Sequence, residues 1–166
     1  MRWRHAAAAC VGALVLGGVG STAVLHGDSV YARGSNDTPE ILAQSSGRDT
    51  GSFASSTAPA FAGGEMLTLQ QGELVAVAAT GSPDRWSFGN GSLVTAPVVS
   101  NGVVYEGSDN GTVYGVSAST GRRVWSGKAG SAILGPDEQD ADVLVGLAVG
   151  GGLLVVPADN QVSAFG

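Results

Sequence analysis

The sequence predicts an all-β protein built from repeated four-stranded antiparallel meanders. Two observations carry this prediction. The 166 residues include 27 glycines but only two methionines, and few strong helix formers, a composition typical of short strands and tight turns. The stretch from residue 96 to 125 then alternates four β-branched or aromatic runs with turn residues. Its runs are Pro97–Val99, Val103–Glu106, Thr112–Val116 and Arg122–Trp125, and its turns are Asn101-Gly102, Asp109–Gly111 and Ser119–Gly121.

This meander has copies along the chain. Thr57-Ala58-Pro59 recurs as Thr95-Ala96-Pro97 after 38 residues, and Trp86 recurs as Trp125 after 39. A period of this length is typical of propeller blades, and one such sheet must stack on others to bury its two faces. We therefore predict a partial β-propeller of about three and a half to four blades. The segment spans residues 24–166, with blades at roughly 23–53, 57–88, 95–127 and 144–166.

The outer two copies keep the strand pattern but lose the tryptophan. In the first copy, Tyr31 stands where Tyr105 stands and Gly47 where Gly121 stands. Either Phe53 or nothing takes the place of Trp125, and the polar stretch 49–57 is interpreted as a loop or an eroded outer strand. The last copy ends where a fourth strand would begin, so we expect only three strands there.

The first 23 residues allow two interpretations. Arg2 and Arg4 precede an uncharged apolar run over 6–20. Ser21-Thr22-Ala23 would serve as a small-residue cleavage site and Val30-Tyr31-Ala32 as a second one, a layout typical of a secretory signal peptide. The chain would then be secreted or extracytoplasmic, with membrane contact only if the apolar run stays as an uncleaved anchor. Alternatively Arg2-Trp3-Arg4 closes an incomplete blade, the start is interior propeller sequence, and the location is cytoplasmic.

Charge and side-chain chemistry argue against several function classes. The net charge of −6 opposes nucleic-acid binding, since only Arg122, Arg123 and Lys128 come close together in the sequence. Cys10 is the only cysteine, which rules out an intrachain disulfide and a cysteine zinc site. The sequence has two histidines and no Gly-x-Ser-x-Gly, so neither a hydrolase nor a zinc enzyme is predicted.

Two of the copies end in a motif that resembles the quinoprotein-type repeat of the pyrroloquinoline quinone (PQQ)-like β-propeller family. One copy has Ala118-Ser119-Thr120-Gly121 followed by Trp125, and the preceding one has Ala79-Thr80-Gly81 followed by Trp86. The resemblance covers roughly residues 23–166. It implies that both tryptophans are structural and dock against a neighbouring blade. It also implies a ring of seven or eight blades, so we expect a protein partner or self-association to complete it.

The resemblance also raises the question of a cofactor, since enzymatic members bind PQQ with calcium held by Glu, Asn and Asp oxygens. Candidate calcium oxygens are Asp109 and Asn110, Asn36 and Asp37, and Asp137 and Asp140 within the acidic run 137–142. We interpret all of these as turn or loop residues. The acidic run does not fit an EF-hand loop, because Asp142 stands at the glycine position and Ala148 at the position of the bidentate glutamate. We expect no catalytic residue, no metal and no cofactor, with PQQ and calcium as the alternative.

Three functional hypotheses follow. The first is a non-catalytic PQQ-like module that acts outside the cytoplasm as a protein-interaction, scaffold or sensor domain. The second is part of a PQQ-dependent alcohol or sugar dehydrogenase whose other blades and cofactor ligands lie outside this chain. The third is a truncated reading frame without independent function.

Overall fold

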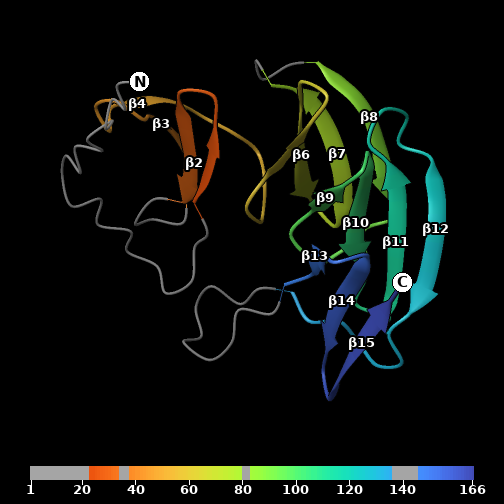
Figure 1. The fold of residues 1–166 in the computed structure, drawn as a ribbon. Coiled ribbons are helices and arrows are strands. Elements are labelled where there is room, and N and C mark those ends of the chain that lie inside the picture. Colours follow the sequence, from red (N-terminus) through yellow and green to blue (C-terminus); the bar gives the residue numbers. More distant parts are fainter. Residues whose placement is uncertain (1–22, 34–37, 80–82, 136–145) are drawn as a thin grey trace, which may run out of the picture.

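The computed structural model describes residues 23–33, 38–79, 83–135 and 146–166. These residues form antiparallel sheets whose strands follow one another in chain order (Figure 1). Blade 1 consists of β1 (Val24–His26), β2 (Ser29–Arg33), β3 (Pro39–Ala43) and β4 (Asp49–Ser52). Blade 2 consists of β5 (Ala60–Ala62), β6 (Glu65–Gln70), β7 (Glu73–Ala78) and β8 (Asp84–Gly89).

The second half of the chain repeats the same order. Blade 3 consists of β9 (Val98–Ser100), β10 (Val103–Gly107), β11 (Thr112–Ser117) and β12 (Arg123–Lys128). Blade 4 consists of β13 (Ala148–Gly150), β14 (Leu153–Ala158) and β15 (Gln161–Phe165). The prediction of a partial propeller is confirmed, with three blades of four strands and one of three among the described residues.

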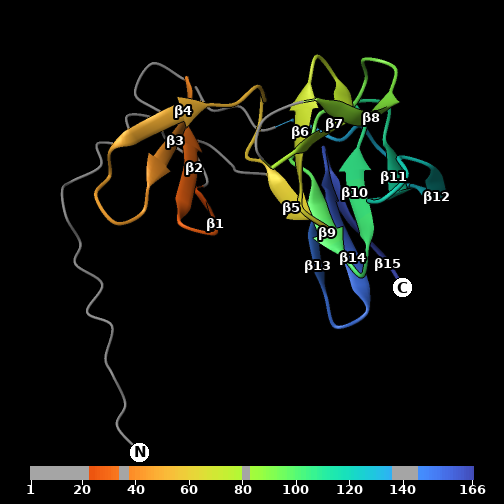
Figure 2. The same ribbon diagram turned by 90° about the horizontal axis from the view of Figure 1, so that it is seen from above.

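Blade 1 lies at one end of the molecule (Figure 2). Contacts of β9 with β5 and with β13 place blade 3 between blades 2 and 4. A buried apolar cluster fills each junction. Tyr31 and Phe53 of blade 1 meet Met66 and Val77 of blade 2. Between blades 2 and 3 the fully buried residues include Leu67, Leu74, Val104 and Val116, and between blades 3 and 4 they include Val113 and Val156. The core is therefore a series of interfaces between sheets, as the stacking argument requires.

The outer strand of blade 1 departs from the pattern of the central blades. Residues 49–52 form strand β4, so the eroded-strand interpretation applies rather than a loop. In blades 2 and 3 the tryptophan pairs with the residue just before a bulge, as Trp86 with Ala76 and Trp125 with Gly115. In blade 1 that position belongs to Gly51, which pairs with Ile41. Phe53 follows two residues later and packs edge-on against Tyr31 at 5.7 Å between ring centroids.

Side chains of β15 and the connection after β12 anchor blade 4. The Ala129 carbonyl accepts hydrogen bonds from Ser163 Oγ at 2.9 Å and from Gln161 Nε2, and Asp159 N donates to the Ala132 carbonyl. These bonds satisfy the backbone carbonyls of Ala129 and Ala132, which would otherwise need water molecules as donors. They also fix which face of β15 points toward blade 3.

Several predictions fall on residues that the structure does not describe. They are the signal peptide or incomplete blade over 1–22, the calcium candidates Asn36, Asp37, Asp137 and Asp140, and the corner residues Thr80 and Gly81. Within the described ranges, no helix has the length and apolarity to cross a membrane.

Candidate functional site

Trp86 on β8 joins blade 2 to blade 3. Its indole nitrogen donates a hydrogen bond of 3.1 Å to the carbonyl of Ala118, which lies at the end of β11 in the next blade. Its ring packs with the buried cluster between the two blades. The contact combines burial of a large aromatic surface with a directional bond, which fixes the rotation of one blade on the next.

Gly121 forms the corner against which this ring lies. Its backbone has a φ of +67°, a conformation in which a side chain is strained. A Cβ at this position would also come within 2.7 Å of the Trp86 ring. Gly121 N donates to the Ser117 carbonyl at 2.9 Å, so the tight corner closes on itself. Both the turn and the approach of the indole therefore require glycine here.

Trp125 on β12 has different surroundings. Its ring lies edge-on to Phe165 of blade 4, with 5.1 Å between the ring centroids, and 6.4 Å from Tyr105 on its own blade. Unlike Trp86, its indole nitrogen has no acceptor among the described residues. Blade 4 is described to Gly166, directly after β15, and presents no corner equivalent to Ala118–Gly121 in that part of the chain.

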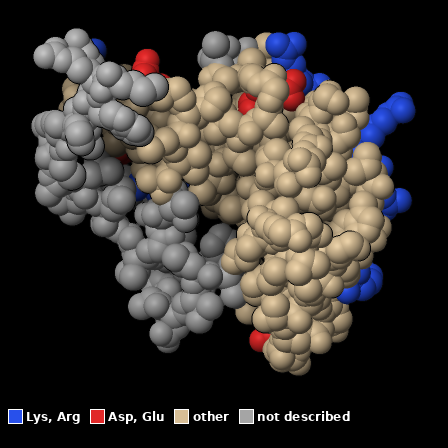
Figure 3. All heavy atoms as spheres, in the orientation of Figure 1, with Lys and Arg blue, Asp and Glu red and all other residues tan. Residues whose placement is uncertain are grey.

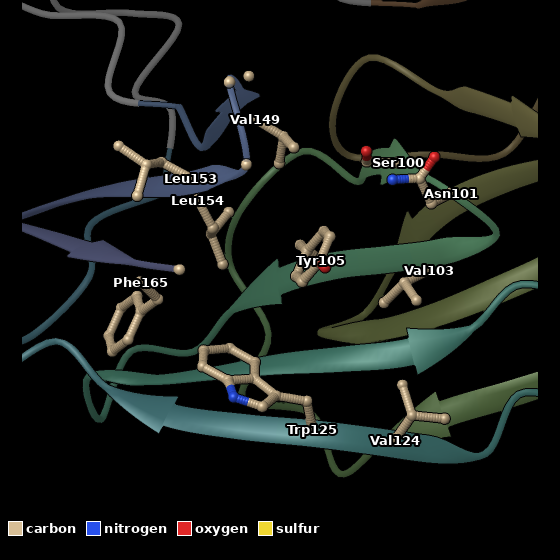
Figure 4. Close-up of a pocket in the computed structure, with 14 residues that line it drawn as sticks. Ser100, Asn101, Val103, Tyr105, Val124, Trp125, Val149, Leu153, Leu154 and Phe165 are labelled. Atoms are coloured by element: carbon tan, nitrogen blue, oxygen red, sulfur yellow. The ribbon is translucent and has the colours of Figure 1, made fainter.

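A groove of about 550 Å³ opens at this place between blades 3 and 4 (Figure 4). Tyr105, Trp125, Leu154 and Phe165 point into it from the two blades, and Asn101 lies at its rim. The far edge of β15 has no strand partner among the described residues. Apolar and aromatic walls beside an unpaired strand edge are suited to an extended peptide or a strand of another protein.

Glu106 on β10 is a fully buried acid that the sequence analysis did not single out. Thr95 Oγ1 donates to Glu106 Oε2 at 2.8 Å and accepts from Gly107 N at 2.8 Å. Oε1 of Glu106 is buried without a partner in the described structure. Burial raises the pKa of Glu106 well above its ordinary value of 4.5, while the bond from Thr95 acts in the opposite direction. Glu106 is fully buried, so we assign it a structural place in the core.

The candidate calcium oxygens of blade 3 are occupied by their own turn. Asn110 Oδ1 accepts from Thr112 N at 3.0 Å and from Thr112 Oγ1 at 2.5 Å, and Asp109 Oδ1 accepts from Ser108 Oγ. This is the local bonding that Asn and Asp supply in turns. Across the described residues, no group of three His, Cys, Asp or Glu side chains converges on a metal position. Asp109 and Asn110 thus bond within their own turn, and no chemical step through a cofactor is assigned to the described residues.

Comparison with known proteins assigns the family. A PQQ-type repeat model described as "Outer membrane protein assembly factor BamB" matches residues 2–165. The chain belongs to this BamB family. A search of curated proteins finds no match. The family membership agrees with the resemblance inferred from the Thr-Gly and tryptophan motifs.

Solved structures share the fold of this BamB-family chain at low sequence identity. BamB from Moraxella catarrhalis has a TM-score of 0.66 at 14% identity, over 88% of this chain and 42% of that one. The computationally designed Ika4 protein has a TM-score of 0.67 at 16% identity, over 88% of this chain and 90% of that one. Quinohemoprotein alcohol dehydrogenase from Comamonas testosteroni has a TM-score of 0.53 at 19% identity, over 65% of this chain and 20% of that one. This chain thus spans less than half of the BamB structure that it matches.

A matched pair of glycines tests the corner beneath Trp86. Gly47 and Gly121 have φ values of +66° and +67°, but a Cβ at Gly47 would meet nothing within 4 Å. We expect Gly47→Ala to cost about 1 kcal/mol of unfolding free energy from backbone strain alone. Gly121→Ala should cost about 1–3 kcal/mol more, because the methyl group collides with the indole. Urea denaturation measures both, and equal losses would contradict the docking role of this corner.

The buried acid predicts a pH dependence of stability. Because its pKa is higher in the folded state than its ordinary 4.5, the folded protein holds the proton more tightly than the unfolded chain. The stabilisation that this proton provides is complete below the ordinary pKa of 4.5. It declines as the pH rises from there toward the higher pKa of the folded state. We expect Glu106→Gln to remove this decline, since the amide keeps the shape and carries no charge. As the pH rises above 4.5, the urea denaturation midpoint of the parent should fall relative to that of the variant. Parallel pH profiles would overturn the assignment of a raised pKa to buried Glu106.

Proposed function

We propose that the chain is a non-catalytic propeller module that binds another protein outside the cytoplasm, as an interaction, scaffold or sensor domain. The observation that carries this proposal is the aromatic groove around Trp125 and Phe165, next to an edge of β15 that has no strand partner among the described residues. Such an edge offers backbone donors and acceptors to an added strand, and the groove offers apolar contact for its side chains.

The charge distribution supports a protein partner rather than a nucleic acid. Arg85, Arg122, Arg123 and Lys128 are exposed on the outer strands or next to them, and blue atoms gather along that edge of the molecule (Figure 3). The surface over β14 and β15 is almost uncharged apart from acidic atoms near its tip. The groove therefore lies in the part of the surface where apolar contact dominates. Core positions of protein interfaces likewise lack charge.

The family and the N-terminal sequence support the extracytoplasmic location. The matching family is described by a factor for outer-membrane protein assembly, and the first 23 residues have the charge and hydropathy layout of a signal peptide. N-terminal sequencing of the protein recovered from the exported fraction should begin at Val24 if cleavage follows Ala23. Recovery of an intact chain starting at Met1 in the cytoplasm would contradict this location.

The dehydrogenase remains the second candidate, because quinohemoprotein alcohol dehydrogenase shares the fold over 65% of this chain. Adding PQQ with Ca²⁺ distinguishes the non-catalytic module from the dehydrogenase. On the proposed function, titration of the 166-residue chain gives no saturable quenching of tryptophan fluorescence and no reduction of an acceptor dye with alcohols or sugars. A reconstituted quinoprotein dehydrogenase serves as the positive control. Calcium-dependent saturation together with dye reduction would overturn the proposed function and establish the second candidate.

A further inference from the structure

The exposed cations of the described chain gather on two outer strands. Six Lys or Arg residues lie in the described ranges, and four of them lie on β8 and β12 or directly before β12. All four are exposed: Arg85, Arg122, Arg123 and Lys128. Figure 3 shows Lys and Arg atoms along the edge at which Figure 1 places β12. The whole chain has a net charge of −6, so this edge differs in sign from the molecule as a whole.

Three of these cations have no partner in the described part of the chain. No carboxylate pairs with the guanidinium groups of Arg85, Arg122 and Arg123 there, and none of the three groups donates a hydrogen bond. Lys128 Nζ donates to Thr112 Oγ1 at 2.6 Å. Charged side chains on outer strands also prevent edge-to-edge pairing of sheets, and that role needs nothing more than exposed charge. Arg123 has further surroundings that this role does not need.

Arg123 lies at a hollow between the outer parts of blades 2 and 3. It pairs with Val116, which is buried in the cluster between these two blades. Directly paired residues of antiparallel strands place their side chains on the same side of the sheet, so Arg123 faces blade 2. The hollow has a volume of about 400 Å³. Its other lining residues are Ser87, Phe88, Gly89, Asn90, Leu93 and Tyr114.

The hollow combines an aromatic wall with hydrogen-bond donors. Phe88 and Tyr114 meet edge-on, with 5.4 Å between their ring centroids. Asn90 Oδ1 accepts from Ser92 Oγ at 2.8 Å, which leaves the amide N–H groups of Asn90 to donate. The Tyr114 hydroxyl and the Arg123 guanidinium have no acceptor in the described structure. A guanidinium fork with further donors beside it suits a carboxylate, which accepts on both oxygens.

The cation at this position belongs to one junction and is not part of the repeat. In blade 2, Asp84 pairs with Val77 as Arg123 pairs with Val116 in blade 3. Val77 lies in the cluster between blades 1 and 2, so the equivalent place at that junction carries an acid. Two neighbouring junctions with the same backbone therefore present opposite charges on their outer strands.

We propose that the hollow beside Arg123 binds a carboxylate side chain in an extended acidic segment of another protein. Arg85, Arg122 and Lys128 attract neighbouring carboxylates of that segment along the outer strands. Charge complementarity selects this occupant, and a single hollow between two strands admits one side chain at a time. A nucleic acid would instead call for a row of about 6–10 phosphate contacts. The site goes beyond the proposed function, because blades 2 and 3 build it alone and Trp125 packs toward blade 4.

Fluorescence anisotropy of a fluorescein-labelled peptide tests the site on the full chain. The probe is a short peptide in which glutamate alternates with serine. We expect a dissociation constant on the order of 100 µM, and a peptide with glutamine in place of glutamate should not bind. Raising the salt concentration from about 50 to about 300 mM should weaken binding about threefold or more, because salt screens the attraction.

Variants of the hollow assign the binding to Arg123. Arg123→Gln should weaken binding about fivefold or more, because the charged fork is lost. Arg123→Lys should keep part of the affinity, because the charge stays while the fork is lost. Tyr114→Phe should weaken binding about twofold and keeps the ring that packs on Phe88. Arg48→Gln is the matched control, since Arg48 is exposed on blade 1 and the change removes the same charge. Far-UV circular dichroism checks that each variant folds.

Several outcomes would overturn the proposal. They are no binding of the glutamate peptide, equal binding of the glutamine peptide, and equal losses from Arg123→Gln and Arg48→Gln. If Arg123→Gln leaves peptide affinity unchanged but increases light scattering, the arginine only prevents edge-to-edge association. Cosedimentation with phosphatidylglycerol vesicles that depends on Arg123, without peptide binding, would assign the edge to a lipid surface instead. None of these measurements involves PQQ or the groove around Trp125, so the proposed function stands or fails separately.

Discussion

The packing of one sheet on the next is the interaction on which the whole structure depends. A four-stranded meander of this size is too thin to enclose a core, so its hydrophobic burial comes from its neighbours. Trp86 gives this packing a defined orientation. Its indole nitrogen donates a hydrogen bond to the Ala118 carbonyl, and its ring lies against Gly121. Where blade 4 meets Trp125, the described residues supply Phe165 but no equivalent corner. The groove between blades 3 and 4 lies at this place.

The repeat could be predicted from the sequence because its signals are local. The Asn101-Gly102 turn and the spacing from Thr120-Gly121 to Trp125 each depend on a few neighbouring residues, and the structure places strands and turns accordingly. The position of Gly51 could not be read in this way. Its equivalence to the tryptophan depends on a bulge in the pairing of β3 with β4, and a bulge shifts the register by one residue without a clear sequence signature.

Glu106 illustrates a second limit of prediction. Strict alternation along β10 puts it on the same face as the buried Val104, so the sequence did contain a signal for its burial. A glutamate on such a face nevertheless suggests an exposed edge unless its partner is known. That partner is Thr95 in the connection from the preceding blade, and it bonds both the carboxyl group and the backbone of Gly107. The acid is tolerated because this long-range arrangement satisfies one oxygen, while burial raises the pKa of Glu106 and so favours its protonated form.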